Sequence, residues 1–186
     1  MRGYQPGWLS EMVSQACQDD IGAVGVKLAS PKRKVVSNGI VLDNAHGGRH
    51  IFRGLSLQDP GYLNWAMLQK GYSALSSACM VIAKDKFEMV GGFSEQFIDH
   101  DYGDIDFCLK LRDKGFRNIV ISSIVLNIDR ILQTNLPSDR GALASRQVEE
   151  ETLIDRWKDW FEHDSAFNPN LTLGLSGRVQ VKLPPE

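Results

Sequence analysis

The sequence has few cysteines and no marked excess of charge of either sign. Its 186 residues include three cysteines, Cys17, Cys79 and Cys108, scattered among apolar neighbours. This small, odd number excludes a disulfide framework and a cysteine zinc site, and it predicts reduced core residues in a cytosolic protein. The formal net charge of -2 and the pI near 6.1 provide no basic surface, so we expect no nucleic-acid partner.

Long hydrophobic runs are also missing. No apolar run approaches the roughly 20 residues that span a membrane, and the first residues do not show the basic-then-apolar pattern of a signal peptide. We therefore expect no membrane span. The hydrophobic content of 42% and the charged content of 24% are typical of a globular protein, and the length fits a single domain over residues 1–186.

Hydrophobic periodicity predicts strands that alternate with helices. Strands are predicted at residues 21–28, 35–42, 73–83 and 118–123, and helices at residues 8–17, 84–90 and beyond Ser138. We expect the first two strands to form a hairpin. Shorter elements are predicted as a helix at residues 62–69 and a strand at residues 49–53 within a Gly- and His-rich loop. This alternation indicates an α/β layer.

The most informative segment contains four carboxylates in eight residues and leads directly into an amphipathic helix. The four acids are Asp99, Asp101, Asp104 and Asp106. At about 100° per residue the helix has a broad apolar face, and Asp106 falls on the opposite, polar face, four residues before Lys110. We therefore interpret Asp106 as a surface ion-pair partner of Lys110, and Asp99 as a loop residue.

Asp104 lies near the middle of the apolar face, one turn before Cys108. A carboxylate in this position should lie at a buried edge or in a cleft, where loss of hydration raises its pKa and suits it to take a proton. Alternatively, Asp104 lies in the first turn and satisfies free backbone N–H groups there. The helix alone leaves both interpretations open and slightly favours capping.

Residue spacing predicts no metal site in this chain. A calcium loop that begins at Asp99 is excluded, because the sequence has neither the third oxygen ligand nor the glutamate that such a loop requires. Asp104 and Asp106 are two residues apart on a helix, so their side chains diverge by about 200° and cannot share one ion. His46 and His50 have no cysteine or glutamate nearby.

A series of short motifs follows one order along nearly the whole chain. The most diagnostic pairing is residues 77–81 (Ser-Ala-Cys-Met-Val) with residues 87–93 (Phe-Glu-Met-Val-Gly-Gly-Phe), followed by the helix at residues 103–116. The remaining motifs are residues 22–25, 38–42, 50–54, 156–157 and 164–171. Together they resemble the second half of a family-2 glycosyltransferase of the GT-A fold, and the last two resemble the C-terminal signature of bacterial members that build surface polysaccharides.

The resemblance implies a partial GT-A-like mixed sheet flanked by helices, without the N-terminal nucleotide-binding half. Its core would cover residues 7–125, and a C-terminal helix and tail would cover residues 138–186. The implied reaction is an inverting transfer of a sugar from a nucleotide-sugar donor to an acceptor hydroxyl in polysaccharide or glycan synthesis. By this resemblance Asp104 is the general base, which reverses the preference for capping, and Asp101, Ser76 and Ser77 line the acceptor side.

The resemblance also has consequences for cofactors and partners. The nucleotide-binding strands and the acid-x-acid metal motif of the family would precede Trp8, and the family's histidine near the donor diphosphate corresponds to Asn127. We therefore expect a divalent metal, Mg or Mn, only in the complete enzyme and none on this chain alone. A partner chain or a homodimer would cover the open sheet edge. The alternative is a non-catalytic module that binds a glycan or a protein. The expected location is the cytoplasm, free or peripheral to the inner membrane.

Overall fold

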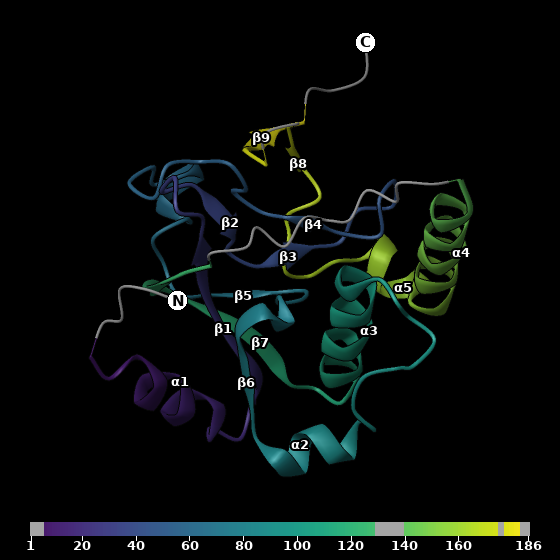
Figure 1. Cartoon of the computed structure of the whole chain (residues 1–186), viewed down its shortest axis with the longest axis horizontal. Helices are drawn as coiled ribbons and strands as arrows, with labels where there is room; N and C mark the ends of the chain where they lie inside the picture. The colour runs from purple at the N-terminus through teal and green to yellow at the C-terminus, as the bar shows by residue number, and fades with distance from the viewer. Residues whose placement is uncertain (1–5, 129–139, 175–176, 183–186) are drawn as a thin grey trace.

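A computed structural model describes residues 6–128, 140–174 and 177–182, and its centre is a curled mixed sheet (Figure 1). The strand order is β2-β1-β7-β5, and β6 also pairs with β1. The bounds of these strands are β1 Ile21–Ala29, β2 Val35–Ser37, β5 Lys70–Tyr72, β6 Met80–Ile82 and β7 Arg117–Asn127. Because β1 and β7 are parallel and the other pairs are antiparallel, the sheet is mixed. This arrangement is compatible with the partial GT-A-like α/β fold expected from the sequence.

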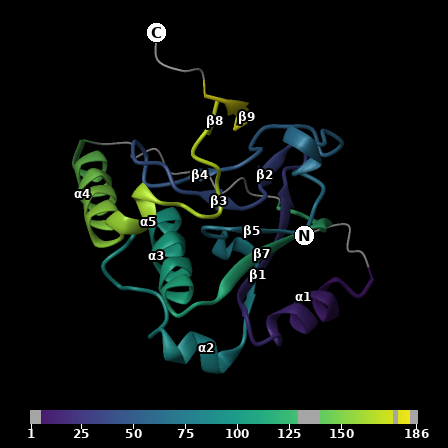
Figure 2. The same ribbon diagram turned by 180° about the vertical axis from the view of Figure 1, so that it is seen from behind.

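Helices cover both faces of the sheet (Figures 1 and 2). On one face α1 (Trp8–Ala16) packs against β1 and β6, and Met12 is fully buried there. On the other face α3 (His100–Asp113) packs against β1 and β7. Every residue of β1 is buried, as a strand covered on two faces requires. The remaining helices are α2 Lys84–Met89, α4 Arg140–Arg156 and α5 Lys158–Glu162.

The two remaining strand pairs are short and lie outside the main sheet. β3 (Ile40–Val41) pairs with β4 (Arg49–His50), and β8 (Leu171–Leu173) pairs with β9 (Val179–Val181). The predicted strand at residues 35–42 is therefore divided into β2 and β3, because Gly39 adopts a φ of 107° and turns the chain between them. The predicted hairpin of the first two strands is confirmed, since β2 pairs antiparallel with β1.

Two of the predicted elements are wrong in large part. The strand predicted at residues 73–83 contains a 3-10 turn at Ser77–Cys79, and only β6 at its end is a strand. Ser76 caps this turn, because its side chain accepts a long hydrogen bond from the backbone N–H of Ala78. The helix predicted at residues 62–69 is a 3-10 turn at Tyr62–Asn64. The last predicted strand, by contrast, continues beyond residue 123 to the end of β7.

The helix predicted beyond Ser138 is present as α4 and α5, which bury apolar side chains on one side. Leu153 and Phe161 are buried, and the tryptophans between them pack against the same core as α3. The polar start that the sequence predicts at Ser138 and the disordered end that it predicts at Pro184 and Pro185 lie outside the described residues. Cysteine burial differs from the prediction, since Cys108 is buried, Cys79 is half-buried and Cys17 is exposed.

Candidate functional site

Asp104 lies in the first turns of α3 and is buried, with 3% of its surface exposed. Its Oδ2 accepts a hydrogen bond of 2.8 Å from the backbone N–H of Ser77. Burial raises the pKa of Asp104 to about 6, partly opposed by the hydrogen bonds from Ser77 and increased by the negative charge of Asp101. The inward orientation predicted from periodicity is confirmed. The N-cap of α3 is a different acid, Asp99, whose side chain accepts from the N–H of Asp101.

Asp101 lies three residues before Asp104 on α3, and its side chain is 29% exposed. Its Oδ1 is 3.2 Å from Nε2 of His50, and the opposite ring nitrogen, Nδ1, is 2.8 Å from Oγ of Ser37. Burial raises the pKa of Asp101, but the hydrogen bond and the charge of His50, together with nearby arginines, hold it below its ordinary value. The two acids of α3 therefore have pKa values shifted in opposite directions. Sequence reasoning missed His50 in this role.

The structure brings Ser77 to Asp104 through its backbone N–H, at 2.8 Å, and a side-chain hydrogen bond from Ser77 also lowers the pKa of Asp104. Ser76 is half-buried, and its hydroxyl oxygen lies 3.4 Å from the N–H of Ala78, within its own turn. Both serines therefore shape the backbone beside Asp104. Their predicted contact with an acceptor stays a prediction.

Asp106 was predicted on the exposed face of α3, and that prediction is wrong. Its side chain is fully buried, although its ion pair with Lys110, at 3.1 Å, is confirmed. Oδ1 accepts hydrogen bonds of 2.9 Å from Arg156 and from the indole N–H of Trp157, and Oδ2 accepts one of 2.6 Å from Ser94. Burial alone would raise the pKa of Asp106, but these donors outweigh it and hold the pKa below its ordinary value. Asp106 therefore connects α3 to the C-terminal helices.

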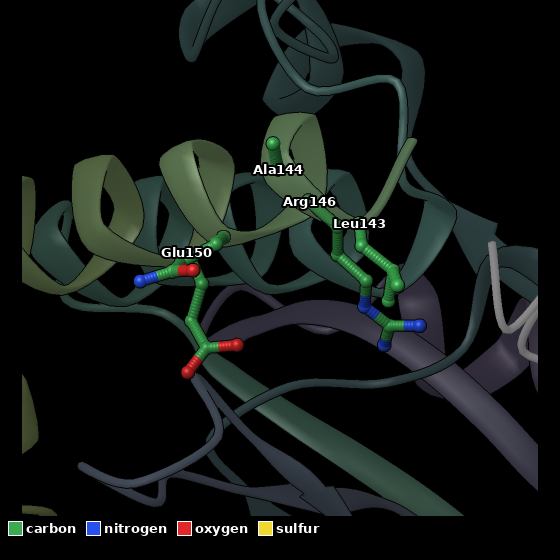
Figure 3. Close-up of a pocket in the computed structure, with 5 residues that line it drawn as sticks. Leu143, Ala144, Arg146 and Glu150 are labelled. Atoms are coloured by element: carbon green, nitrogen blue, oxygen red, sulfur yellow. The ribbon is translucent and has the colours of Figure 1, made fainter. Parts of the chain in front are cut away.

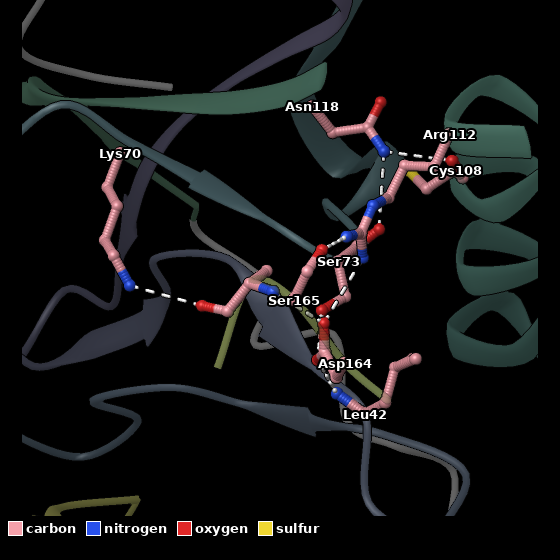
Figure 4. Close-up of polar contacts among 9 residues, drawn as sticks. Leu42, Lys70, Ser73, Cys108, Arg112, Asn118, Asp164 and Ser165 are labelled. Carbon is pink, nitrogen blue, oxygen red and sulfur yellow. Dashed lines mark hydrogen bonds and ion pairs between the residues drawn. The ribbon is translucent and has the colours of Figure 1, made fainter. Parts of the chain in front are cut away.

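A second set of polar contacts, centred on Asp164, holds the segment that precedes Ser77 (Figure 4). Asp164 accepts hydrogen bonds from the Ser73 hydroxyl, from the N–H of Leu42 at 3.2 Å and from the N–H of Ala166 at 2.9 Å. Arg112 of α3 forms an ion pair with the same carboxylate at 3.3 Å. The segment after α5 is thereby attached both to α3 and to the backbone just before Ser77.

Asn118 of β7 strengthens this attachment from the sheet side. Its amide Nδ2 donates to the carbonyl of Ser73 at 3.3 Å and to the carbonyl of Cys108 at 2.9 Å. Because Ser73 and Cys108 belong to two different segments, one side chain sets the distance between them. The position of the Ser77 N–H relative to Asp104 is therefore determined by buried polar contacts rather than by a free loop.

An open hollow of about 450 Å³ lies along α4, lined by Leu143, Ala144, Arg146, Gln147 and Glu150 (Figure 3). This α4 hollow adjoins the start of α3. Nε of Arg146 is 3.4 Å from Oδ2 of Asp99, and Glu150 accepts a hydrogen bond of 2.6 Å from the Tyr102 hydroxyl. Its lining combines hydrogen-bond donors and acceptors with aliphatic carbon, which suits a hydroxyl-rich ligand.

The described residues form neither a metal-ligand cluster nor a membrane-spanning helix. Within residues 6–128, 140–174 and 177–182, no three His, Cys, Asp or Glu side chains come together as metal ligands would. In the same parts of the chain, no helix combines the length and apolar character needed to cross a membrane.

Comparison with known proteins finds two related sequences, and no family model matches the chain. Uncharacterized protein y4gI of Sinorhizobium fredii is 33% identical over 171 residues, which is 90% of this chain and 18% of that protein. O-antigen biosynthesis protein RfbC of Myxococcus xanthus is 30% identical over 185 residues, which is 93% of this chain and 13% of that protein. The chain therefore spans less than a fifth of the length of these two relatives.

Proposed function

We propose that this chain carries the acceptor-side part of an inverting glycosyltransferase that acts in polysaccharide or glycan synthesis. The observation that carries the proposal is Asp104, a buried carboxylate with a pKa of about 6 at the start of α3. A group with this pKa is ionised at neutral pH and still basic enough to take a proton. The similarity to an O-antigen biosynthesis protein supports glycan synthesis as the setting.

In the proposed reaction, Asp104 accepts the proton of an acceptor hydroxyl. The acceptor oxygen then attacks the anomeric carbon of the donor sugar, a new glycosidic bond forms, and the bond to the nucleoside diphosphate breaks. The diphosphate leaves with the bonding electron pair. Attack from the face opposite the leaving group inverts the anomeric centre. Asp101 and the turn at Ser76 and Ser77 would then face the acceptor, and the α4 hollow, which adjoins the start of α3, would be a space for further sugar residues.

The described residues do not fit the divalent metal that family-2 glycosyltransferases use at the donor diphosphate. Both carboxylate oxygens of Asp106 are already bonded, because they contact Ser94, Lys110, Arg156 and Trp157. Asp104 is bonded to the Ser77 N–H instead. We propose that Mg²⁺ or Mn²⁺ and the nucleotide are held by a donor-binding half outside residues 1–186, and we assign no step of this chain to the metal.

The experiment is a sugar-transfer assay on this chain combined with its donor-binding half. Uridine and thymidine nucleotide-sugars are supplied with Mn²⁺ and acceptor glycans, and release of nucleoside diphosphate is measured. We expect Asp104→Asn to lose about a hundredfold or more in rate with the fold intact. Asp113→Asn is the matched control, because Asp113 is exposed at the other end of the same helix.

Two outcomes would decide against the proposal. Normal turnover by Asp104→Asn would show that Asp104 is not the base. Binding of acceptor glycan without transfer of any of the supplied sugars, unchanged by Asp104→Asn, would favour the alternative of a non-catalytic glycan-binding module.

A further inference from the structure

Three side chains from three elements form a continuous chain of contacts beside Asp104. Ser37 ends β2, His50 ends β4, and Asp101 lies in the first turn of α3. Nδ1 of His50 lies 2.8 Å from Ser37 Oγ, and Nε2 lies 3.2 Å from Asp101 Oδ1. Ser37 is buried and the His50 side chain is only 12% exposed, so the ring is held between its two partners.

Hydrogen-bond chemistry determines where the protons lie in the series Ser37–His50–Asp101. An ionised carboxylate only accepts hydrogen bonds, so Nε2 of His50 carries a hydrogen and donates it to Asp101. A serine hydroxyl can both donate and accept. Ser37 therefore donates to Nδ1 when the ring is neutral and accepts from Nδ1 when the ring is charged. The contact with Asp101 is retained in both states of His50.

Several charged groups face these side chains from the surrounding elements. Asp101 is under the electrostatic influence of His50 from β4, of Arg53 from the following loop and of Arg146 from α4. Asp104 is influenced by Asp101 and His50 in opposite directions. The other charged groups that contact the start of α3 are Asp99, Glu149 and Glu150.

We propose that His50 is a positioning residue for the proposed transfer: through its bridge from Ser37 it holds Asp101 ionised, and so separates the roles of the two acids on α3. The role in sugar transfer rests on the proposed function, whereas the effect of His50 on Asp101 does not. Two side chains three residues apart on a helix are neighbours, so the charge of Asp101 raises the pKa of Asp104, while the bridge holds the pKa of Asp101 below its ordinary value. With it, Asp101 stays the anion at the more exposed position, and Asp104 is left as the group that takes the proton.

The test is a carboxyl ¹³C NMR titration of the 186-residue chain labelled at aspartate, without donor or acceptor. Wild type is compared with His50→Ala, His50→Gln and His46→Ala. We expect His50→Ala to raise the pKa of Asp101 by about one, because the charge-assisted hydrogen bond is lost. We expect His50→Gln to keep the pKa of Asp101 lower than His50→Ala does, since a glutamine amide can donate to Asp101 and accept from Ser37.

His46→Ala is the control variant, and two results would overturn the proposal. His46 is exposed in the loop before β4, and its replacement should leave the pKa of both acids unchanged. The proposal is overturned if the pKa of Asp101 in His50→Ala equals that in wild type. If His50→Ala does not fold, Asp101→Asn carries the test: it must lower the pKa of Asp104, and an unchanged value overturns the proposal.

These results are distinguishable from a failure of the proposed function. The titration needs neither donor nor acceptor, so an inactive protein with the expected pKa changes would contradict the transferase assignment and leave the His50 bridge in place. An active protein whose His50 variants keep the wild-type pKa values would contradict the His50 bridge and leave the transferase assignment in place.

Discussion

Replacing Asp104 with asparagine should stabilise the fold at neutral pH, although it removes the proposed base. The buried carboxyl has a pKa of about 6 in the folded protein, against an ordinary value of 3.8. The folded state therefore binds the proton more tightly than the unfolded state, so the free energy of unfolding falls as pH rises from about 4 to about 6. The difference of about 2 in pKa corresponds to at most about 3 kcal/mol.

Asparagine has no such titration, and its side-chain oxygen can still accept from the Ser77 N–H. We expect Asp104→Asn to match wild type near pH 4 and to exceed it by about 1–3 kcal/mol above pH 6, less the cost of burying the amide. Urea unfolding followed by circular dichroism at several pH values from 4 to 8 gives both free energies. In the difference between the two free energies of unfolding, the contributions of groups that titrate equally in both proteins cancel.

The sign of this pH dependence decides whether the reasoning holds. A difference between variant and wild type that is constant from pH 4 to 8 would show that Asp104 has an ordinary pKa. A variant that becomes relatively less stable as pH rises would show that the ionised carboxylate is stabilised in the fold. Either result would remove the physical basis for its role as a base. Asp113→Asn should show no pH-dependent difference, because Asp113 is exposed.

Three further variants test the contacts that hold the site, each by urea unfolding at pH 7. Asp106→Asn should destabilise the fold by about 2 kcal/mol, the opposite sign to Asp104→Asn, because the buried carboxylate loses its charged hydrogen bonds with the partly exposed Lys110 and Arg156. Asp164→Asn should cost about 2 kcal/mol and expose the segment after α5 to protease; unchanged stability would contradict its role as a shared acceptor. Gly39→Ala should cost more than Gly54→Ala, because both have positive φ but only at Gly39 would a β-carbon lie 2.5 Å from the Tyr72 ring.

The burial of Asp104 could be predicted from sequence, whereas that of Asp106 could not. Asp104 shares a helix face with Cys108, so the helical period allowed an inward position, but the helix alone did not exclude capping and the family resemblance decided between the two. The side of α3 that carries Asp106 is covered by Arg156 and Trp157, which lie 50 and 51 residues further along the chain. Helical periodicity contains no information about a neighbour that folds back from such a distance.

His50 was missed for a similar reason. Its partners Asp101 and Ser37 are 51 and 13 residues away, and they belong to α3 and β2, so the three meet only in the folded chain. The sequence signal was weak: His50 is one of two histidines in a Gly-rich loop, and it lies within one of the motifs of the family resemblance. The wrong strand at residues 73–83 has a local cause instead, because the Ser76 side chain competes with sheet hydrogen bonds.

The pH dependence of sugar transfer by the wild-type protein, combined with its donor-binding half, connects the buried carboxyl to the reaction. If Asp104 takes the acceptor proton, kcat/KM increases about tenfold per pH unit below pH 6 and becomes constant above it, because only the ionised carboxylate is active. A rate that is constant from pH 5 to 7, or that falls as Asp104 ionises, would contradict its assignment as the base.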